Sequence, residues 1–254
     1  MYVYLYDQFL RQRQYAAVAR AIEISLTDYG ITGKILRLNN FIDVKPLIDD
    51  EVKRGAKTVV IVGNDKTFGA VLSRSATCPV TFGFLPIGPG NTIAGVLGIP
   101  VGGGAADVLS RRRKERLDIG WVNSRYFVSQ LRVPPARVEV FYDDRFKASA
   151  NDLLEVVVCN LQPFVWRRHG RVPKSEVVHP QDGKLEAFLR PLTKRRWFGY
   201  RYEEPSIFPF TEMMIRGREP FVVAADGKIT KEREVTIKLA RAQVEMIVGR
   251  DRKF

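Results

Sequence analysis

The sequence is poor in the residues that form covalent cross-links and metal sites. It has 254 residues but only two cysteines, Cys78 and Cys159, and two histidines, His169 and His179. The cysteines are far apart in the sequence, and neither histidine has the spacing to a cysteine that a zinc site needs. Because no secretory signal points to an oxidising compartment, we expect both thiols to be reduced and structural.

Long apolar stretches are also missing. No apolar run approaches the roughly 20 residues that span a bilayer as a helix. The N-terminal MYVYLYDQF has no basic start, no long apolar core and no small-residue cleavage site, so it does not have the pattern of a signal peptide. We therefore expect a cytoplasmic globular protein, associated with a membrane only at its surface. The length allows one large or two modest domains.

The net charge of +13 is concentrated in the second part of the chain. Residues 1–110 carry 11 Lys and Arg against 9 Asp and Glu, whereas residues 111–254 carry 30 against 19. Basic clusters occur there as RRRKER (111–116), WRRHGR (166–171) and KRRWFGYRY (194–202). Basic residues attract anionic lipid or nucleic acid, and Trp and Tyr suit a membrane interface.

An anionic membrane surface is therefore the partner that we expect, with no specific nucleic acid. A solvated surface that is merely basic is the alternative, because charge runs alone are weak evidence of binding. A homodimer is left open, since an exposed β edge could support one.

The first 117 residues alternate between predicted strands and helices. Apolar or β-branched runs predict strands at 1–6, 34–38, 57–63 and 81–88, and helical spacing predicts helices at 16–26, 43–54, 67–72 and 91–98. The run KTVVIVG has no polar alternation, which is typical of a parallel strand covered on both faces. The pattern predicts an α/β domain with a doubly wound, mainly parallel sheet.

After Leu117 the pattern changes to strands alone. Apolar runs joined by Asn123-Ser124 and by Asp143-Asp144 predict two hairpins. Later runs at 210–217, 220–226, 233–240 and 244–249 predict further strands. We expect an antiparallel β-sandwich over residues 118–242, with the tail, about 243–254, packing back on the α/β domain.

Two glycine-bearing turns follow consecutive strands of the first domain. One is Gly63-Asn64-Asp65-Lys66-Thr67, and the other is Gly88-Pro89-Gly90-Asn91-Thr92. Each turn begins a helix, whose N-terminal N–H groups and dipole favour phosphate, and Asn91 is a good N-cap candidate. Neither turn is a P-loop or a GxGxxG motif. Two ordinary tight turns are the alternative, but their position on neighbouring strands favours a phosphate site.

The stretch VVIVGNDKTFGAVLS (59–73), followed by FGFLPIGPGNTIAGVLGIP (82–100), resembles the catalytic domain of the diacylglycerol and sphingosine kinases, relatives of the NAD kinases. That family has a strand, a GGDGT turn and a helix, then a second strand, a GTGND turn and a helix ending in LGIP. A later DG-x-L-x-V strand is matched by residues 182–187, and a DGE motif by residues 226–228. The resemblance implies an α/β nucleotide-binding domain followed by a β-sandwich for the lipid.

The resemblance implies ATP-dependent phosphorylation of a lipid hydroxyl, with ATP and Mg²⁺ bound in the cleft between the domains. The positions that match the nucleotide turns are Gly63, Asn64, Asp65, Lys66, Thr67, Gly88, Gly90, Asn91 and Thr92. Asp65 and Asp182 match metal ligands. Asp226 matches the general base that takes the proton from the substrate hydroxyl, which is a step that phosphoryl transfer needs.

Four positions depart from the family pattern. Asn64 and Lys66 replace glycines of GGDGT, and Thr92 and Lys228 replace the acids of GTGND and DGE. If Lys66 had to adopt a glycine conformation, the strain would be about 1–2 kcal/mol. Lys66 could instead supply a positive charge to a phosphate.

The family's N-terminal NPxSG loop is absent as well, although Arg11 and Arg13 could contact phosphate from the segment in its place. These departures leave a second interpretation open, a catalytically weak or inactive nucleotide- or lipid-binding protein of the same fold. A third interpretation is a different substrate, such as NAD, or a nucleic-acid-binding protein. The LGIP segment favours the lipid branch over the NAD kinases.

Overall fold

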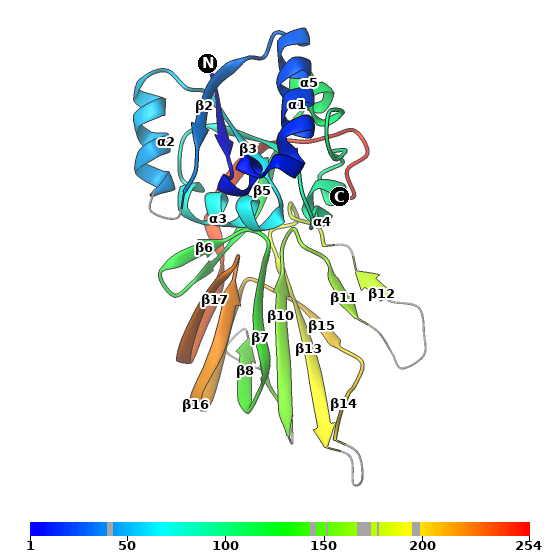
Figure 1. The fold of residues 1–254 in the computed structure, drawn as a ribbon. Helices are drawn as coiled ribbons and strands as arrows, with labels where there is room; N and C mark the ends of the chain where they lie inside the picture. The colour runs from blue at the N-terminus through cyan, green and yellow to red at the C-terminus, as the bar shows by residue number, and fades with distance from the viewer. Residues whose placement is uncertain (40–42, 143–145, 151, 167–173, 177, 195–198) are drawn as a thin grey trace. The chain divides into compact units, whose positions relative to one another are not determined.

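The computed structural model describes residues 1–39, 43–142, 146–150, 152–166, 174–176, 178–194 and 199–254. The chain divides into two compact units. The first consists of Met1–Leu117 with Ala242–Lys253, and the second consists of Asp118–Arg241 together with Phe254. The first is α/β and the second is built of antiparallel strands, which confirms the predicted fold class (Figure 1).

The first unit is a parallel sheet flanked by helices. Its strands are β1 (Tyr2–Tyr6), β2 (Gly33–Arg37), β3 (Thr58–Gly63) and β4 (Thr81–Pro86). They pair in the order β4-β3-β1-β2, and the end of β17 (Lys228–Ile247) adds a parallel pairing of Met246 with Phe82 of β4. Both β3 and β4 are buried along their whole length, as expected of parallel strands covered on both faces.

The helices of this unit are α1 (Ala16–Asp28), α2 (Val44–Lys53), α3 (Asp65–Ser75), α4 (Thr92–Val96) and α5 (Ala105–Arg111), with the 3-10 turns η1 (Gln8–Arg11) and η2 (Arg13–Tyr15). Helix α2 lies beside α3, and α1 lies beside α5, on either side of the strands (Figure 1). No helix among the described residues is long and apolar enough to cross a membrane. Both cysteines are free and buried, which agrees with the structural role expected for them.

The second unit consists of strands. They are β5 (Lys114–Val122), β6 (Arg125–Phe127), β7 (Gln130–Ala136), β8 (Val138–Tyr142), β9 (Phe146–Ser149), β10 (Leu153–Cys159), β11 (Phe164–Trp166), β12 (Lys174–Glu176), β13 (Leu185–Lys194), β14 (Tyr200–Tyr202), β15 (Ser206–Phe210), β16 (Glu212–Ala225) and most of β17. The hairpins β5–β6 and β8–β9 form where the sequence predicts them, but Asp143-Asp144 lies outside the described residues. The strand β10 pairs between β7 and β13, and all three pack on one apolar core.

The sequence predicts four separate strands between residues 210 and 249, and this division is wrong. Residues 212–225 form one strand, and residues 228–247 form another. The register of their pairing shifts between Arg216 and Phe221, so the Gly217–Pro220 stretch interrupts the regular pairing. A glycine and a proline can thus interrupt the ladder locally while the strand continues.

The C-terminal tail, residues 248–253, crosses the end of α4 at close range. The N–H of Gly249 donates to the carbonyl oxygen of Leu97 (2.8 Å), and the N–H of Lys253 donates to that of Val96 (2.9 Å). A Cβ built on Gly249 would lie 1.7 Å from the carbonyl oxygen of Gly98. Only glycine therefore permits this crossing, because no side chain fits between the two backbones.

We predict that Gly249→Ala lowers the free energy of unfolding by about 1–3 kcal/mol, because the added methyl group collides with rigid backbone atoms. Gly95→Ala is the matched control. A Cβ at Gly95 meets nothing within 4 Å, and alanine is the better helix former by about 1 kcal/mol. Urea unfolding of both variants measures the difference. Equal stability of the two variants would contradict the close crossing.

Candidate functional site

The first glycine-bearing turn is closed by Asn64. This residue is the N-cap of α3, and its Oδ1 accepts hydrogen bonds from the N–H groups of Lys66 (3.1 Å) and Thr67 (3.2 Å). In return the N–H of Asn64 donates to the Oγ1 of Thr67 (3.3 Å). This capping box satisfies the donors at the start of the helix. The amides of Lys66 and Thr67, which the sequence assigns to phosphate, are therefore already bonded.

Lys66 takes an ordinary helical conformation, so the condition for a glycine-like strain is not met. Among the described non-glycine residues, only Arg112, Asn123 and Asp226 have a positive φ. The reason is that Asn64 is extended (φ −118°, ψ −174°), and the helix begins at the next residue. The exposed Lys66 side chain adds a positive charge at the N-terminus of α3.

Thr67 connects this turn to the first strand. Its buried hydroxyl donates to the Oδ2 of Asp7 (2.6 Å), and the N–H of Asp7 donates to the carbonyl oxygen of Val62 at the end of β3 (3.0 Å). A Cβ on Gly63 would lie 2.5 Å from the same hydroxyl, so the glycine leaves room for it. Thr67 and Gly63 thus fix the turn against β1, a role different from the phosphate contact that the sequence assigns.

Asp65 joins the two turns. Its N–H donates to the carbonyl oxygen of Gly90 (2.9 Å). Its Oδ2 accepts from the N–H of Thr92 (2.7 Å), and its Oδ1 accepts from that of Ile93 (3.2 Å). Burial raises the pKa of Asp65 to about 6, although the two amides act in the opposite direction. A residue of α3 therefore caps the N-terminus of α4.

The prediction of Asn91 as the N-cap of α4 is confirmed in position but not in its side-chain contact. Asn91 occupies the N-cap position, but its side chain makes no capping hydrogen bond. Its Nδ2 donates instead to the carbonyl oxygen of Gly88 (2.6 Å), which stabilises the turn. The Oδ1 of Asn91 is buried and has no hydrogen-bond partner among the described residues.

Three backbone N–H groups of the second turn are not used in hydrogen bonds to described residues. Gly88 and Gly90 have φ of +86° and +78°, conformations that other residues adopt only with strain. No described residue accepts a hydrogen bond from the N–H groups of Gly88, Gly90 or Asn91. Successive N–H groups in such a turn form a concavity that suits an anion. Of the two turns, this one has more backbone N–H groups without a described acceptor.

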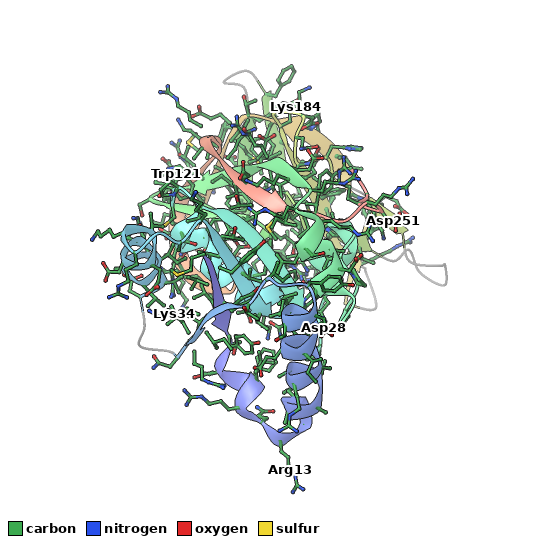
Figure 2. All side chains as sticks on the ribbon, turned by 90° about the horizontal axis from the view of Figure 1, so that it is seen from above. Arg13, Asp28, Lys34, Trp121, Lys184 and Asp251 are labelled. Atoms are coloured by element: carbon green, nitrogen blue, oxygen red, sulfur yellow. The ribbon has the colours of Figure 1, made fainter. Side chains whose placement is uncertain are left out.

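The segment after β1 packs against the second turn, a contact that the sequence gives no signal for. The ring of Phe9 would lie 3.0 Å from a Cβ on Gly88, and it makes an edge contact with Tyr15 (5.0 Å between ring centroids). Arg11 and Arg13 are exposed on the adjoining 3-10 turns, and Figure 2 shows Arg13 pointing away from the unit. Phe9 therefore packs against Gly88 at the start of the turn, while Gly90 has no atom within 4 Å of its Cβ position.

Asp226 lies in the hairpin turn between β16 and β17. Its φ is +45° and that of Gly227 is +81°, the conformation of a tight Asp-Gly hairpin turn. Its carboxylate accepts hydrogen bonds from the N–H groups of Val128 (2.6 Å), Ser129 (3.0 Å) and Gln130 (3.3 Å). Burial raises the pKa of Asp226, and the three amides oppose that rise. The carboxylate thus holds the start of β7, and its role as general base stays a prediction.

The second acidic site predicted for a metal is exposed. The Oδ1 of Asp182 accepts from the N–H of Lys184 (3.0 Å), and the N–H of Gly183 donates to the buried Asp118 (2.9 Å). Burial and the charge of Asp182 raise the pKa of Glu186 to about 7. Across the described ranges, no group of three or more His, Cys, Asp or Glu side chains gathers as a metal site would require. The magnesium role of Asp182 stays a prediction.

The basic clusters are only partly described. Residues 167–171 of WRRHGR and 195–198 of KRRWFGYRY lie outside the described residues. The ring of Trp166 is buried beside Phe188, and its Nε1 donates to Glu204 (3.0 Å). This tryptophan therefore belongs to a core and is not placed to enter a membrane interface.

Comparisons with known proteins agree with the resemblance in the turns. Residues 4–122 match the family model of the diacylglycerol kinase catalytic domain. The fold is similar to the crystal structure of a diacylglycerol kinase from Bacillus anthracis str. Sterne (TM-score 0.77, 17% identity), covering 99% of this chain and 97% of that one. Two candidate diacylglycerol kinases from the same organism are similar as well. One has a TM-score of 0.75 at 17% identity, covering 98% of this chain and 97% of its own. The other has a TM-score of 0.73 at 15% identity, covering 97% of both chains. No curated protein matches the sequence. The suspected resemblance to the lipid kinase family is thereby confirmed.

We predict that Thr67→Val destabilises the protein by about 1–3 kcal/mol, because it removes the hydroxyl donor of the half-buried Asp7 carboxylate. Thr67→Ser keeps the hydroxyl and should cost less than about 1 kcal/mol. Urea unfolding at neutral pH measures both variants. A valine variant as stable as the serine variant would show that the hydroxyl contributes nothing.

The raised pKa of Asp65 makes a second prediction. Its pKa is about 6 in the folded protein against an ordinary 3.8. As the pH rises, the Asp65 carboxyl group therefore loses its proton at a lower pH in the unfolded chain than in the folded protein. The contribution of this group to stability is therefore complete below its ordinary pKa and is lost as the pH rises through its folded pKa. The stability advantage of the wild type over Asp65→Asn should shrink across that interval. An advantage that stays constant or grows in urea unfolding would contradict the assigned burial.

Proposed function

We propose that the chain binds a nucleoside triphosphate at its second turn and transfers phosphate to the hydroxyl group of a lipid, as a diacylglycerol-kinase-like enzyme. The observation that supports it most is the double turn. Two turns stand at the carboxyl ends of the neighbouring parallel strands β3 and β4, where open α/β sheets bind ligands, and Asp65 joins them. This segment lies inside the match to the diacylglycerol kinase catalytic domain.

In this proposal the unbonded amides of Gly88, Gly90 and Asn91 hold a phosphate group of ATP. Lys66, at the start of α3, contributes a positive charge from the first turn. Asp226 takes the proton from the lipid hydroxyl, because a carboxylate whose pKa is raised by burial is a better base than an exposed one. Its amide contacts give it a structural role at the same time.

A magnesium ion suits the donors of the double turn if it arrives with the nucleotide. Mg²⁺ on a nucleotide keeps several waters and needs only one or two protein carboxylates. Asp65 is the carboxylate at the turns, and a carboxylate has more lone pairs than its two amide donors use. The bound ion would neutralise charge on the phosphates during transfer.

The lipid substrate would be met at an anionic membrane surface. The exposed side chains of Lys228, Lys231 and Arg233 lie along one part of β17. A basic side chain near an anionic leaflet contributes about 1 kcal/mol of attraction. We therefore propose peripheral association with the membrane, with no specific nucleic acid as partner.

A second function is favoured by the capping of the first turn. Asn64 occupies the amides that a glycine at this position would leave free for phosphate. Thr92 and Lys228 also lack the carboxylates of the family motifs. These observations support a protein of the same fold that binds nucleotide or lipid with little or no transfer.

A kinase assay with Mg–ATP and a panel of hydroxyl lipids, including diacylglycerol, tests the proposal. We expect transfer by the wild type and a loss of about 100-fold or more in Asp226→Asn, as for removal of a general base. Asp152→Asn is the matched control, because Asp152 also accepts an amide hydrogen bond, from Lys194 (2.9 Å). Asn64→Gly should lower the KM for ATP by freeing amides at α3.

The outcomes separate the two functions. Transfer that depends on Asp226 but not on Asp152 supports the kinase. No transfer to any lipid, together with a rise in melting temperature on addition of Mg–ATP, supports the binding protein. The absence of both transfer and thermal shift contradicts a nucleotide site at the turns.

A further inference from the structure

A cavity with several arginines in its lining lies in the first unit, outside the two turns. It has a volume of about 820 Å³, within the range of small-molecule sites. Helix α5, the loop after α4 and the C-terminal tail line it, and its charged residues are Asp107, Arg111, Arg113, Arg250 and Asp251. We call it the arginine cavity. Figure 1 shows the red C-terminal tail beside α4, and Figure 2 labels Asp251 on that tail. None of its lining residues belongs to either turn.

The arginines of the RRR run at 111–113 have different roles. Arg112 takes a left-handed conformation (φ 51°) that ends α5, and its guanidinium donates to the hydroxyl of Tyr2 (2.5 Å) and lies over that ring (5.4 Å). Arg112 does not line the arginine cavity, whereas Arg111 and Arg113 do. Arg112, which ends α5, thus lies in the sequence between Arg111 and Arg113, and only these two line the arginine cavity.

The tail shows the same division. Arg252 forms an ion pair with Glu115 (2.7 Å) and does not line the cavity. Arg250 lines the cavity, and within the described ranges neither Arg250 nor Arg113 has an acidic partner within ion-pair distance. Arg112 and Arg252, each with a fixed protein partner, lie outside the cavity. Arg113 and Arg250, which have no acidic partner in the described ranges, line it.

The charges inside the cavity favour an anion. Three arginines face two aspartates there, and Asp107 already pairs with the Nε of Arg111 (2.8 Å). The terminal amino groups of Arg111 make no further hydrogen bond within the described part of the chain. Each guanidinium group carries a positive charge that a bound anion can pair with. Its planar fork matches the oxygens of phosphate.

We propose that the arginine cavity binds a phosphate group carried by a small molecule or by a lipid headgroup, with Arg113 and Arg250 as its main contacts. Arg111 completes the site through its terminal amino groups. Gly98 and Gly249 also line the cavity, so their amide groups can report on its occupancy. A ligand there also holds the tail, which is bonded to α4 through Gly249.

The full chain labelled with ¹⁵N on glycine provides a site-resolved test, with inorganic pyrophosphate as the probe. We expect saturable shifts of the Gly98 and Gly249 amide signals. Arg250→Ala should weaken this binding about tenfold or more, and Arg113→Ala should do the same. Arg20→Ala is the matched control, because Arg20 is exposed on α1 and lines no part of the cavity.

The glycines of the turns report on the nucleotide site separately, so failure at one site is distinct from failure at the other. Static Gly98 and Gly249 signals, or shifts that survive Arg250→Ala, overturn the proposal. Because Arg113 directly precedes β5 and its variant could fail to fold, the result for Arg250 on the tail decides the matter.

Two further probes identify the carrier of the phosphate. Shifts of Gly249 with glycerol 3-phosphate indicate a soluble ligand. Binding to phosphatidylcholine vesicles that contain phosphatidate, lost in Arg250→Ala but kept in Arg20→Ala, indicates a headgroup. A response to neither carrier overturns the proposal in the form stated.

Discussion

The contact on which the candidate site depends is the one between the Asp65 carboxylate and the start of α4. A helix of five residues has no stability of its own in water, because the cost of nucleation is not recovered over so short a length. The N–H groups of Thr92 and Ile93 find their acceptor on α3, and the N–H of Asp65 donates back to Gly90. The shape of the second turn is therefore set by a residue of the first.

The two turns have different roles in this arrangement. Asn64 uses its side chain to close the start of α3, so that turn is built for stability. The second turn has two glycines of positive φ and amides without described acceptors, so it is open to an anion. A glycine at position 64 could not close α3 in this way, because it has no side chain to accept from the helix amides. The departure from the family pattern thus changes the balance between rigidity and phosphate binding.

Local sequence patterns predicted the fold well, but they did not predict the contacts between residues that are far apart in the sequence. The uniform apolar run of β3 identified a buried parallel strand, and turn residues placed the hairpins, since both signals depend only on neighbouring positions. The cap of α4 by Asp65 joins residues 27 apart, and the amide contacts of Asp226 join residues up to 98 apart. Residue type alone could favour Asn91 as a cap, but only the tertiary structure shows which carboxylate reaches the helix.

Helix α4 is held at both ends by segments distant in sequence. Asp65 binds its first turn, and the tail binds the carbonyl oxygens of Val96 and Leu97 at its last. Its position is therefore set by these two distant segments, because a helix of five residues depends on its surroundings for stability. The arginine cavity lies against the tail end and the open turn lies at the other. Helix α4 is therefore the element that lies next to both candidate sites.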